Sequence, residues 1–224
     1  MSEGGYLLKT PWDRAVFGID TYELKSSTRE ALECADTIPG HFSVRVDPTV
    51  SKSLLHEFGY YYCDTLLEPY CCRGDFVEHY HDNVDISTDI PLEELLTICD
   101  GAFEHGRFHR DFNLDVGASD RRYNHWLHQL FREQTVFSLM FDNDVAGFFA
   151  AIGDRIVLHA LSPSYKGKRL AKYLWSAACV RLFDSGHDEL RSSISVSNLA
   201  VVNLYVSLGF RFRGAYDVYH KLNH

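Results

Sequence analysis

The sequence predicts a mixed α/β fold, with a small N-terminal α/β unit over residues 1–85 followed by a larger unit over residues 86–224. Two observations support this prediction. Short apolar runs with the alternation of strands recur along the whole chain, and helical patterns fall between them. From residue 135 onward, a meander of three strands precedes strand–helix units, an order that gives a mixed rather than a purely parallel sheet.

The N-terminal unit is expected to contain two strands and one helix. Phe42–Val46 alternates as a half-buried strand does, and residues 60–70 are rich in aromatic and apolar side chains. Between them, residues 49–58 predict a helix that Gly59 would cap. Residues 74–85 are polar and acidic, so we expect a linker or an exposed segment there.

Two helices are expected next. Residues 91–102 predict the first, because Pro91 is favoured in a first helical turn, with Ser87 or Asp89 as its cap. Residues 107–120 combine Asn, Asp and Gly, which indicates a loop. Residues 121–133 place apolar side chains at helical spacing and predict an amphipathic helix.

The remainder is expected to begin with a hairpin and then alternate strands with helices. Asp142-Asn143-Asp144 is a turn signal between two apolar runs. The predicted elements are strands at 135–141, 145–152 and 156–161, a helix at 172–183, a strand before Asn198 and a helix after it, and a final strand at 215–222.

Composition argues against several classes of partner. The net charge of −9 contrasts with the basic excess of nucleic-acid-binding proteins, so we expect no nucleic-acid partner. No apolar run reaches membrane-spanning length, and Met1–Tyr6 lacks the features of an export signal, so a cytoplasmic protein is expected. The six cysteines form no Cys-x-x-Cys pair, which favours reduced thiols over a zinc site. His79 and His81 lie in an acidic run that we interpret as a solvated loop rather than a metal site.

A strand–turn–helix motif carries the strongest functional signal. The apolar strand that ends at Leu161 runs into a basic, glycine-containing turn at residues 162–171, and a helix is expected to begin at Lys172. Free amides at a helix N-terminus carry positive partial charge, so such a turn can cradle a pyrophosphate. The alternative is a solvated basic turn without a ligand.

This motif and a second one downstream resemble the GNAT superfamily of acyl-CoA N-acyltransferases. Leu161-Ser162-Pro163 resembles the family's strand end, and Lys166 to Ala171 its loop. Asn198, Tyr205 and Gly209-Phe210 match the later element at the family's spacing. Two departures are visible, because Lys166 replaces the usual Gln or Arg and Arg169 replaces the central Gly. Since the loop acts through backbone amides, a side chain at residue 169 is tolerated while its φ stays negative.

The resemblance implies acetyl-CoA as co-substrate and no metal. The residues implied to bind acetyl-CoA are Leu161, Lys166, Gly167, Lys168, Arg169, Leu170, Ala171, Asn198 and Tyr205. Tyr205 would act as the general acid that protonates the CoA thiolate, because a phenol remains protonated at pH 7. Its alternative role is an aromatic core residue, and that of Asn198 is a helix N-cap. The outer edge of the strand 158–161 would face the pantetheine amides.

The upstream half resembles the dTDP-fucosamine (dTDP-4-amino-4,6-dideoxygalactose) N-acetyltransferase family of GNAT enzymes. The resembling segments are Pro11–Gly18, Phe58-Gly59-Tyr60 and the stretch from Ala102 through Arg107-Phe108 to Tyr123 and Trp126. This resemblance implies a nucleotide-linked amino sugar as acceptor. The residues implied to bind it are Arg107, Phe108, Arg110 and Asp111, since arginine suits a diphosphate and an aromatic ring suits thymine. The alternative is an ordinary polar loop.

Three residues are candidates for the general base. The resemblance favours a carboxylate just after Tyr60, with Asp64 as first choice and Glu68 as second. His159 is a third candidate on chemical grounds alone. The alternatives are exposed carboxylates and a structural histidine, and an amine of modest pKa needs no dedicated base.

These features together predict a cytoplasmic N-acetyltransferase in which an amine attacks the thioester directly, through a tetrahedral intermediate. The acceptor is expected to be a small primary amine, first of all a nucleotide-linked amino sugar. Other amines remain open: an antibiotic, a polyamine or a peptide N-terminus. A non-catalytic acyl-CoA sensor is the alternative of a different class. A homodimer is compatible with the sequence.

Overall fold

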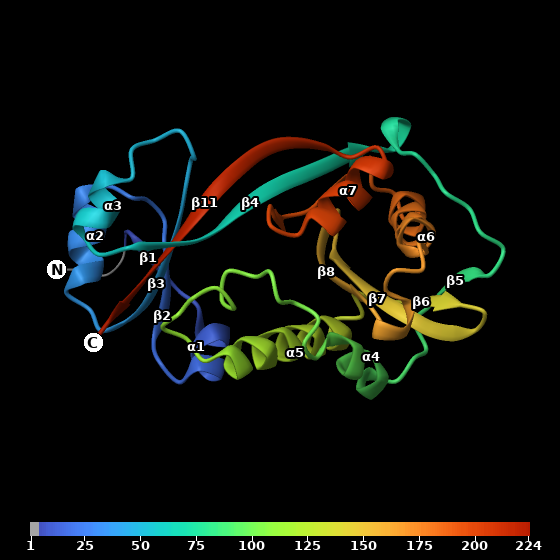
Figure 1. The fold of residues 1–224 in the computed structure, drawn as a ribbon, viewed down its shortest axis with the longest axis horizontal. Coiled ribbons are helices and arrows are strands. Elements are labelled where there is room, and N and C mark those ends of the chain that lie inside the picture. Colours follow the sequence, from blue (N-terminus) through green and yellow to red (C-terminus); the bar gives the residue numbers. More distant parts are fainter. Residues whose placement is uncertain (1–4) are drawn as a thin grey trace.

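The computed structural model describes residues 5–224 and has an elongated shape in which two long strands connect two lobes (Figure 1). The start of the segment Met1–Tyr6, on which the expectation of no export signal rests, lies outside the described residues. The helices are α1 (Pro11–Phe17), α2 (Arg29–Asp36), α3 (Ser53–Glu57), α4 (Leu92–Cys99), α5 (Val116–Arg132), α6 (Ala171–Asp184) and α7 (Leu199–Ser207), with short 3-10 turns at Arg73–Asp75 and Pro163–Tyr165. The strands are β1 (Leu7–Lys9), β2 (Thr21–Leu24), β3 (Gly40–Val46), β4 (Tyr61–Cys72), β5 (Val84–Ser87), β6 (Val136–Phe141), β7 (Asp144–Ile152), β8 (Arg155–Leu161), β9 (Glu189–Arg191), β10 (Ile194–Ser195) and β11 (Arg211–Asn223).

One mixed sheet runs through the molecule in the order β1-β2-β3-β11-β4-β9-β8-β7-β6-β5, with β10 paired to β4. The pairs β2–β3 and β8–β9 are parallel and the others are antiparallel. This confirms the mixed α/β fold. No helix within residues 5–224 has both the length and the apolar character needed to cross a membrane.

The long strands β4 and β11 join the two halves. β11 pairs with β3 from Asp217 to Asn223 and with β4 along most of its length, so the last strand is longer than predicted. The N-terminal lobe has its own apolar cluster, built from residues 22–60 and completed by Tyr219 of β11. The division of the chain near residue 85 stays a prediction.

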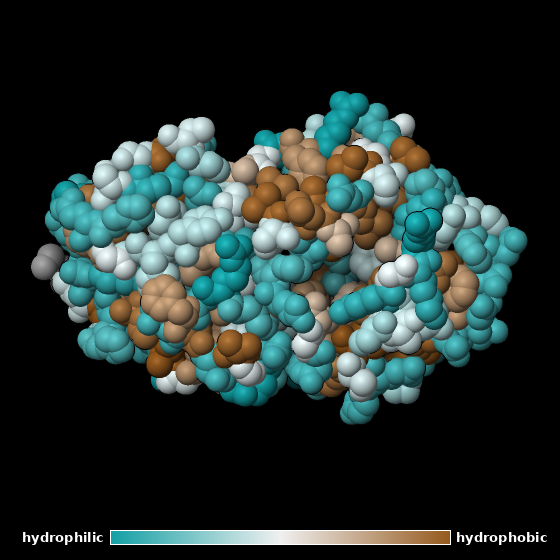
Figure 2. Space-filling model, in the orientation of Figure 1, coloured by the Kyte–Doolittle hydropathy of each residue, from teal (hydrophilic) through white to brown (hydrophobic). Residues whose placement is uncertain are grey.

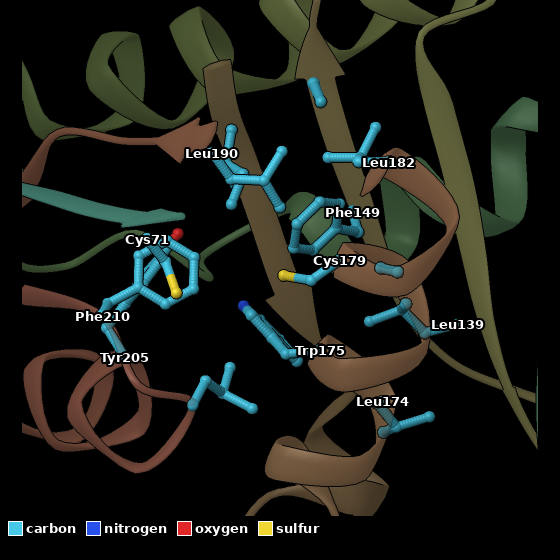
Figure 3. Packing of buried hydrophobic residues seen from close by; sticks show 14 of the residues in the cluster. Cys71, Leu139, Phe149, Leu174, Trp175, Cys179, Leu182, Leu190, Tyr205 and Phe210 are labelled. Carbon is cyan, nitrogen blue, oxygen red and sulfur yellow. The ribbon is translucent and has the colours of Figure 1, made fainter. Parts of the chain in front are cut away.

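Helices cover the C-terminal half of the sheet on both sides. α4 and α5 pack on one face through Leu95, Leu127 and Leu130. α6 and α7 pack on the other through a cluster that includes Trp175 and Tyr205 (Figure 3). The predicted helix at 172–183 and the strands of the meander are thereby confirmed, as is the Asp142-Asn143 turn, where both residues have positive φ.

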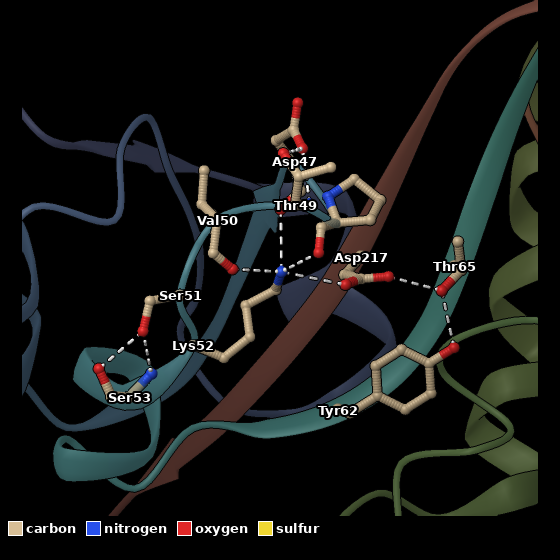
Figure 4. Close-up of polar contacts among 10 residues, drawn as sticks. Asp47, Thr49, Val50, Ser51, Lys52, Ser53, Tyr62, Thr65 and Asp217 are labelled. Atoms are coloured by element: carbon tan, nitrogen blue, oxygen red, sulfur yellow. Dashed lines mark hydrogen bonds and ion pairs between the residues drawn. The ribbon is translucent and has the colours of Figure 1, made fainter.

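Three local predictions are wrong, each for an identifiable reason. α3 begins at Ser53 rather than at residue 49, because Lys52 Nζ donates to the carbonyls of Asp47, Pro48 and Val50 and closes a separate turn (Figure 4). α4 is preceded by Pro91 and has no side-chain cap, so neither Ser87 nor Asp89 caps it. α5 begins inside the predicted loop at Val116, because the carboxylate of Asp115 accepts from the Ala118 amide at 2.7 Å.

Residue 209 follows the C-cap of α7, and both its backbone conformation and its neighbours require glycine there. Its φ is +86°, and a Cβ placed on it would lie 2.3 Å from the Asp75 carbonyl oxygen. Gly209→Ala is therefore expected to lower the free energy of unfolding by about 3 kcal/mol, measured by urea denaturation. Gly18→Ala is the control, because Gly18 has φ +71° with open space around it and should lose only about 1 kcal/mol. Equal losses in the two variants would contradict the steric argument.

Candidate active site

The sheet opens beside β8. β8 and β9 pair only where Arg155 meets Arg191. Beyond that point β10 follows β4 instead, with Ser195 opposite Leu66, so the two halves of the sheet diverge. β8 pairs with β7 along one edge. In the part of the chain that the structure describes, its other edge, which faces β10, therefore has no strand partner from Val157 to Leu161. Figure 2 shows a hollow on this face at the place where β8 lies in Figure 1.

The basic turn lies at the open end of this gap, after β8 and before α6. No side chain caps α6, and the amides of Gly167, Arg169 and Leu170 donate to no protein group within residues 5–224. Gly167 has φ +77° and Arg169 has φ +62°. The expectation of a negative φ at Arg169 is thus wrong, and this side chain occupies a conformation that favours glycine. The turn nevertheless presents free amides at a helix N-terminus, the arrangement that binds anions.

Tyr205 of α7 lies in the interior beside the gap. Its side chain is fully buried, and its hydroxyl is 3.2 Å from His159 Nε2. Burial raises the pKa of Tyr205 above its ordinary value, so the phenol keeps its proton. Asn198 accepts a hydrogen bond from the Val201 amide at 3.2 Å, which confirms its interpretation as the N-cap of α7. A contact between Asn198 and CoA stays a prediction.

His159 and Trp175 complete the surroundings of this phenol. Burial lowers the pKa of His159 to about 4, so the ring is neutral at pH 7 and its Nε2 can accept from Tyr205. The ring of Trp175 packs edge-on against His159 at a centroid distance of 5.0 Å. His159 is therefore a partner of the phenol and less suited than Asp64 to be the base.

Asp64 lies on β4, on the side of the sheet that faces α5. Its side chain is 1% exposed, and its Oδ1 accepts from Ser195 Oγ at 2.8 Å and from the Thr65 amide at 2.9 Å. Its Oδ2 has no hydrogen-bond partner. Burial raises the pKa of Asp64, while the Ser195 hydrogen bond and the Arg110 charge oppose that rise. A buried carboxylate with one free oxygen and a raised pKa has the properties of a general base.

The loop between α4 and α5 brings two predicted arginines towards Asp64. Arg110 Nη1 lies 3.3 Å from Asp64 Oδ1, and the Arg110 side chain is 37% exposed. The guanidinium of Arg107 lies 4.8 Å from the ring centroid of Phe108 and makes no ion pair within residues 5–224. Burial, followed by the charges of Arg45 and Arg122, lowers the pKa of Arg107 to about 10. An arginine without a protein anion beside a candidate base is suited to bind an anionic group of a ligand.

Asp111 and Phe108 are buried. Asp111 Oδ2 contacts His41 Nε2 at 2.8 Å and His220 Nδ1 at 2.7 Å, and its Oδ1 accepts from the Tyr61 hydroxyl and the Asn113 amide. Both oxygens are thus occupied by protein donors, and Asp111 anchors the loop that carries Arg110. Substrate contact by Asp111 and Phe108 stays a prediction.

The three groups of this cluster could also hold a metal ion, since their ligand atoms lie within 4.8 Å of one another. Both imidazole nitrogens, however, approach the same carboxylate oxygen at hydrogen-bond distance. His41, Asp111 and His220 come from three distant segments, so no spacing in the sequence predicts the cluster. Ser195 and Asp64 are also far apart in the sequence, so no spacing predicts their contact.

Asp111→Asn is expected to destabilise the protein. If the amide oxygen takes the place of Oδ2 between the histidines, the amide NH2 group faces the Asn113 N–H and the Tyr61 hydroxyl and leaves the Asn113 donor unsatisfied. We therefore expect a loss of about 3 kcal/mol in the free energy of unfolding. Chemical denaturation followed by circular dichroism measures it. Asp20→Asn, at a half-exposed surface ion pair, is the control and should change stability by less than about 1 kcal/mol. A loss no larger than that of the control would contradict the anchoring role.

A comparison with known families finds one match. Residues 102–210 match the model of the acetyltransferase (GNAT) family. This part of the chain is a GNAT acetyltransferase family domain, which supports acetyl-CoA-dependent N-acetyl transfer. No curated protein sequence matches the chain.

Solved structures share the fold at low sequence identity. A GCN5-related N-acetyltransferase from Sphaerobacter thermophilus has a TM-score of 0.64 at 11% identity, covering 96% of this chain and 75% of that one. A functionally unknown conserved protein from Staphylococcus epidermidis has a TM-score of 0.65 at 12% identity, covering 100% and 94%. A tandem GNAT protein from the clavulanic acid biosynthesis pathway has a TM-score of 0.55 at 11% identity, covering 90% and 75%. The closer resemblance to the dTDP-fucosamine enzymes stays a prediction.

Proposed function

We propose that this enzyme acetylates the primary amine of a small molecule, with a nucleotide-linked amino sugar as the leading acceptor. The observation that carries the proposal is the divergence of β8 from β10, with the free amides of the basic turn at its open end, Tyr205 on one side of the sheet and Asp64 on the other. Such an arrangement allows donor and acceptor to approach one another from opposite faces.

In this proposal acetyl-CoA enters the gap beside β8. Its pyrophosphate binds the turn from Lys166 to Ala171 through the free amides of Gly167, Arg169 and Leu170, with the side chains of Lys166, Lys168 and Arg169 adding charge. The pantetheine amides pair with the free edge of β8, as an added strand does. A backbone N–H near Leu161 stabilises the oxyanion of the tetrahedral intermediate.

The proton transfers are assigned to two residues. Asp64 Oδ2 accepts the proton of the acceptor ammonium, directly or through water, which frees the amine lone pair to attack the thioester carbonyl. When the intermediate collapses, Tyr205 donates its proton to the departing CoA thiolate. Arg107 and Arg110 contact the acceptor next to Asp64. We place the enzyme in the cytoplasm, which six free cysteines support.

The test is product analysis with purified protein. Acetyl-CoA is incubated with dTDP- and UDP-amino sugars, polyamines, aminoglycosides and peptides, and mass spectrometry follows acetylated products while thiol release is monitored. The proposal expects one acetyl group on a sugar nucleotide. Acetylation of another amine alone would exclude the sugar-nucleotide proposal, and tight acetyl-CoA binding without any product would favour a sensor.

A further inference from the structure

A pocket lined by four arginines lies at the closed end of the gap. It has a volume of about 220 Å³, and its lining includes Arg45, Arg155, Arg191 and Arg213 together with Glu68 and Ser192. The arginines come from the four strands β3, β8, β9 and β11. Four arginines thus converge on one place in a chain of net charge −9, and carboxylates that pair with three of them offset their mutual repulsion.

Strand register places three of these arginines on the face of the sheet that carries Asp64. Arg45 and Asp64 both lie opposite Val218 of β11, and directly opposed residues project to the same face. Arg191 lies opposite Tyr70 of β4, which is on the face of Asp64 because an even number of residues separates the two. Arg155 is the register partner of Arg191.

Three of the four guanidinium groups form ion pairs with carboxylates that do not line the pocket. Arg191 pairs with Asp154 at 2.9 Å, Arg45 with Glu23 at 3.5 Å, and Arg213 with Glu189. Arg155 has no acidic partner within ion-pair distance among residues 5–224. Glu68 is the only acidic residue in the lining. The pocket thus combines three arginines held by ion pairs with Arg155, which has none. Guanidinium groups bind the oxygens of a phosphate in bidentate fashion, so this set suits a phosphate.

The pocket is distinct from the turn proposed to hold the CoA pyrophosphate. That turn follows the C-terminal end of β8, whereas Arg155 begins the strand, about 20 Å away along its length. Ser192 lines the pocket, and its hydroxyl donates to the Ile156 carbonyl at 2.9 Å. On β4, Glu68 lies about 13 Å from Asp64. A ligand in the pocket therefore lies close to the proposed reaction centre on the acceptor side.

We propose that this pocket binds a phosphoryl group of the acceptor, with Arg155 and Arg191 as its principal ligands. The inference rests on the proposed function and deepens it, because it requires an acceptor that carries phosphate as well as an amine. Polyamines and aminoglycosides, which are cationic, would not occupy it. A free phosphate ion offers the same chemistry, and the experiment separates the two sources.

Binding is tested first, with inorganic pyrophosphate as the probe in isothermal titration calorimetry of protein saturated with CoA, which occupies the basic turn. The variants are Arg155→Ala/Arg191→Ala and, as a milder change, Arg155→Gln. The control Arg14→Ala/Arg29→Ala removes two surface ion-paired arginines elsewhere. We expect the first double variant to weaken pyrophosphate binding at least about tenfold and the control to leave it unchanged. Unchanged pyrophosphate binding in the CoA-saturated double variant would overturn the proposal.

Kinetics then identify the source of the phosphate. With an acceptor that carries phosphate, the double variant should raise the acceptor KM about tenfold while kcat and the acetyl-CoA KM stay within about threefold. An equal rise for a phosphate-free amine would contradict an acceptor site. If no amine is acetylated, the proposed function fails, and the calorimetric result still decides whether the pocket binds phosphate.

Discussion

Tyr205→Phe is expected to lower kcat by about 100-fold or more. The variant removes one oxygen from a fully buried side chain and leaves the apolar packing of the ring in place. The loss follows from the proton that the phenol supplies: without it, CoA departs as an unprotonated thiolate. The acetyl-CoA dissociation constant should change little, because the turn and the edge of β8 are untouched.

Steady-state kinetics and calorimetry with acetyl-CoA measure the two quantities. Tyr60→Phe is the matched control, since Tyr60 is also buried but packs in the N-terminal cluster, and its hydroxyl has no hydrogen-bond partner. Its kcat should match that of the wild type. A Tyr205→Phe enzyme with normal kcat would remove the acid role and return Tyr205 to a core residue.

Asp64→Asn is expected to lower kcat/KM for the acceptor by about 100-fold or more at neutral pH. The amide retains the shape of the side chain but cannot take a proton. In the wild type, activity should fall as pH drops through the pKa of Asp64, because only the carboxylate accepts a proton. Since burial raises that pKa, the fall should begin above the ordinary value of about 3.9.

Arg110→Ala sharpens the test of the base. The positive charge of Arg110 opposes the raised pKa of Asp64, so its removal should move the acidic limb of the pH–rate profile to higher pH. Glu68→Gln is the carboxylate control and should leave the limb in place. If Glu68→Gln changed the acidic limb of the pH–rate profile and Arg110→Ala did not, the base would be Glu68.

Local patterns predicted most of the fold because each depends on residues near in sequence. The alternation of β3, the hairpin at Asp142-Asn143 and the glycines 59 and 209 all express backbone preferences within a few residues. The start of α5 was missed because it depends on one capping carboxylate, Asp115. The length of β11 was underestimated because its pairing with β3 depends on residues far away in the chain.

In the candidate site, too, some residues are predicted by local motifs and others depend on contacts between distant segments. The turn at 166–171 and Tyr205 belong to motifs that local spacing preserves, and the structure brings both to the gap beside β8. Asp64 acquires its raised pKa from burial in the folded chain, and its partners Ser195 and Arg110, which oppose that rise, lie far from it in sequence. The prediction for Asp111 followed from the resemblance of its segment to the sugar-nucleotide enzymes, whereas its burial between His41 and His220 arises only in the folded chain.

A crystal structure with CoA bound tests the central claim most directly. We expect the pyrophosphate on the amides of residues 166–171, the pantetheine along the free edge of β8, and the thiol sulfur within about 4 Å of the Tyr205 hydroxyl. Asp64 would then face the thiol from the acceptor side. A pantetheine arm that lies outside the gap, or a sulfur far from Tyr205, would contradict the proposed mechanism.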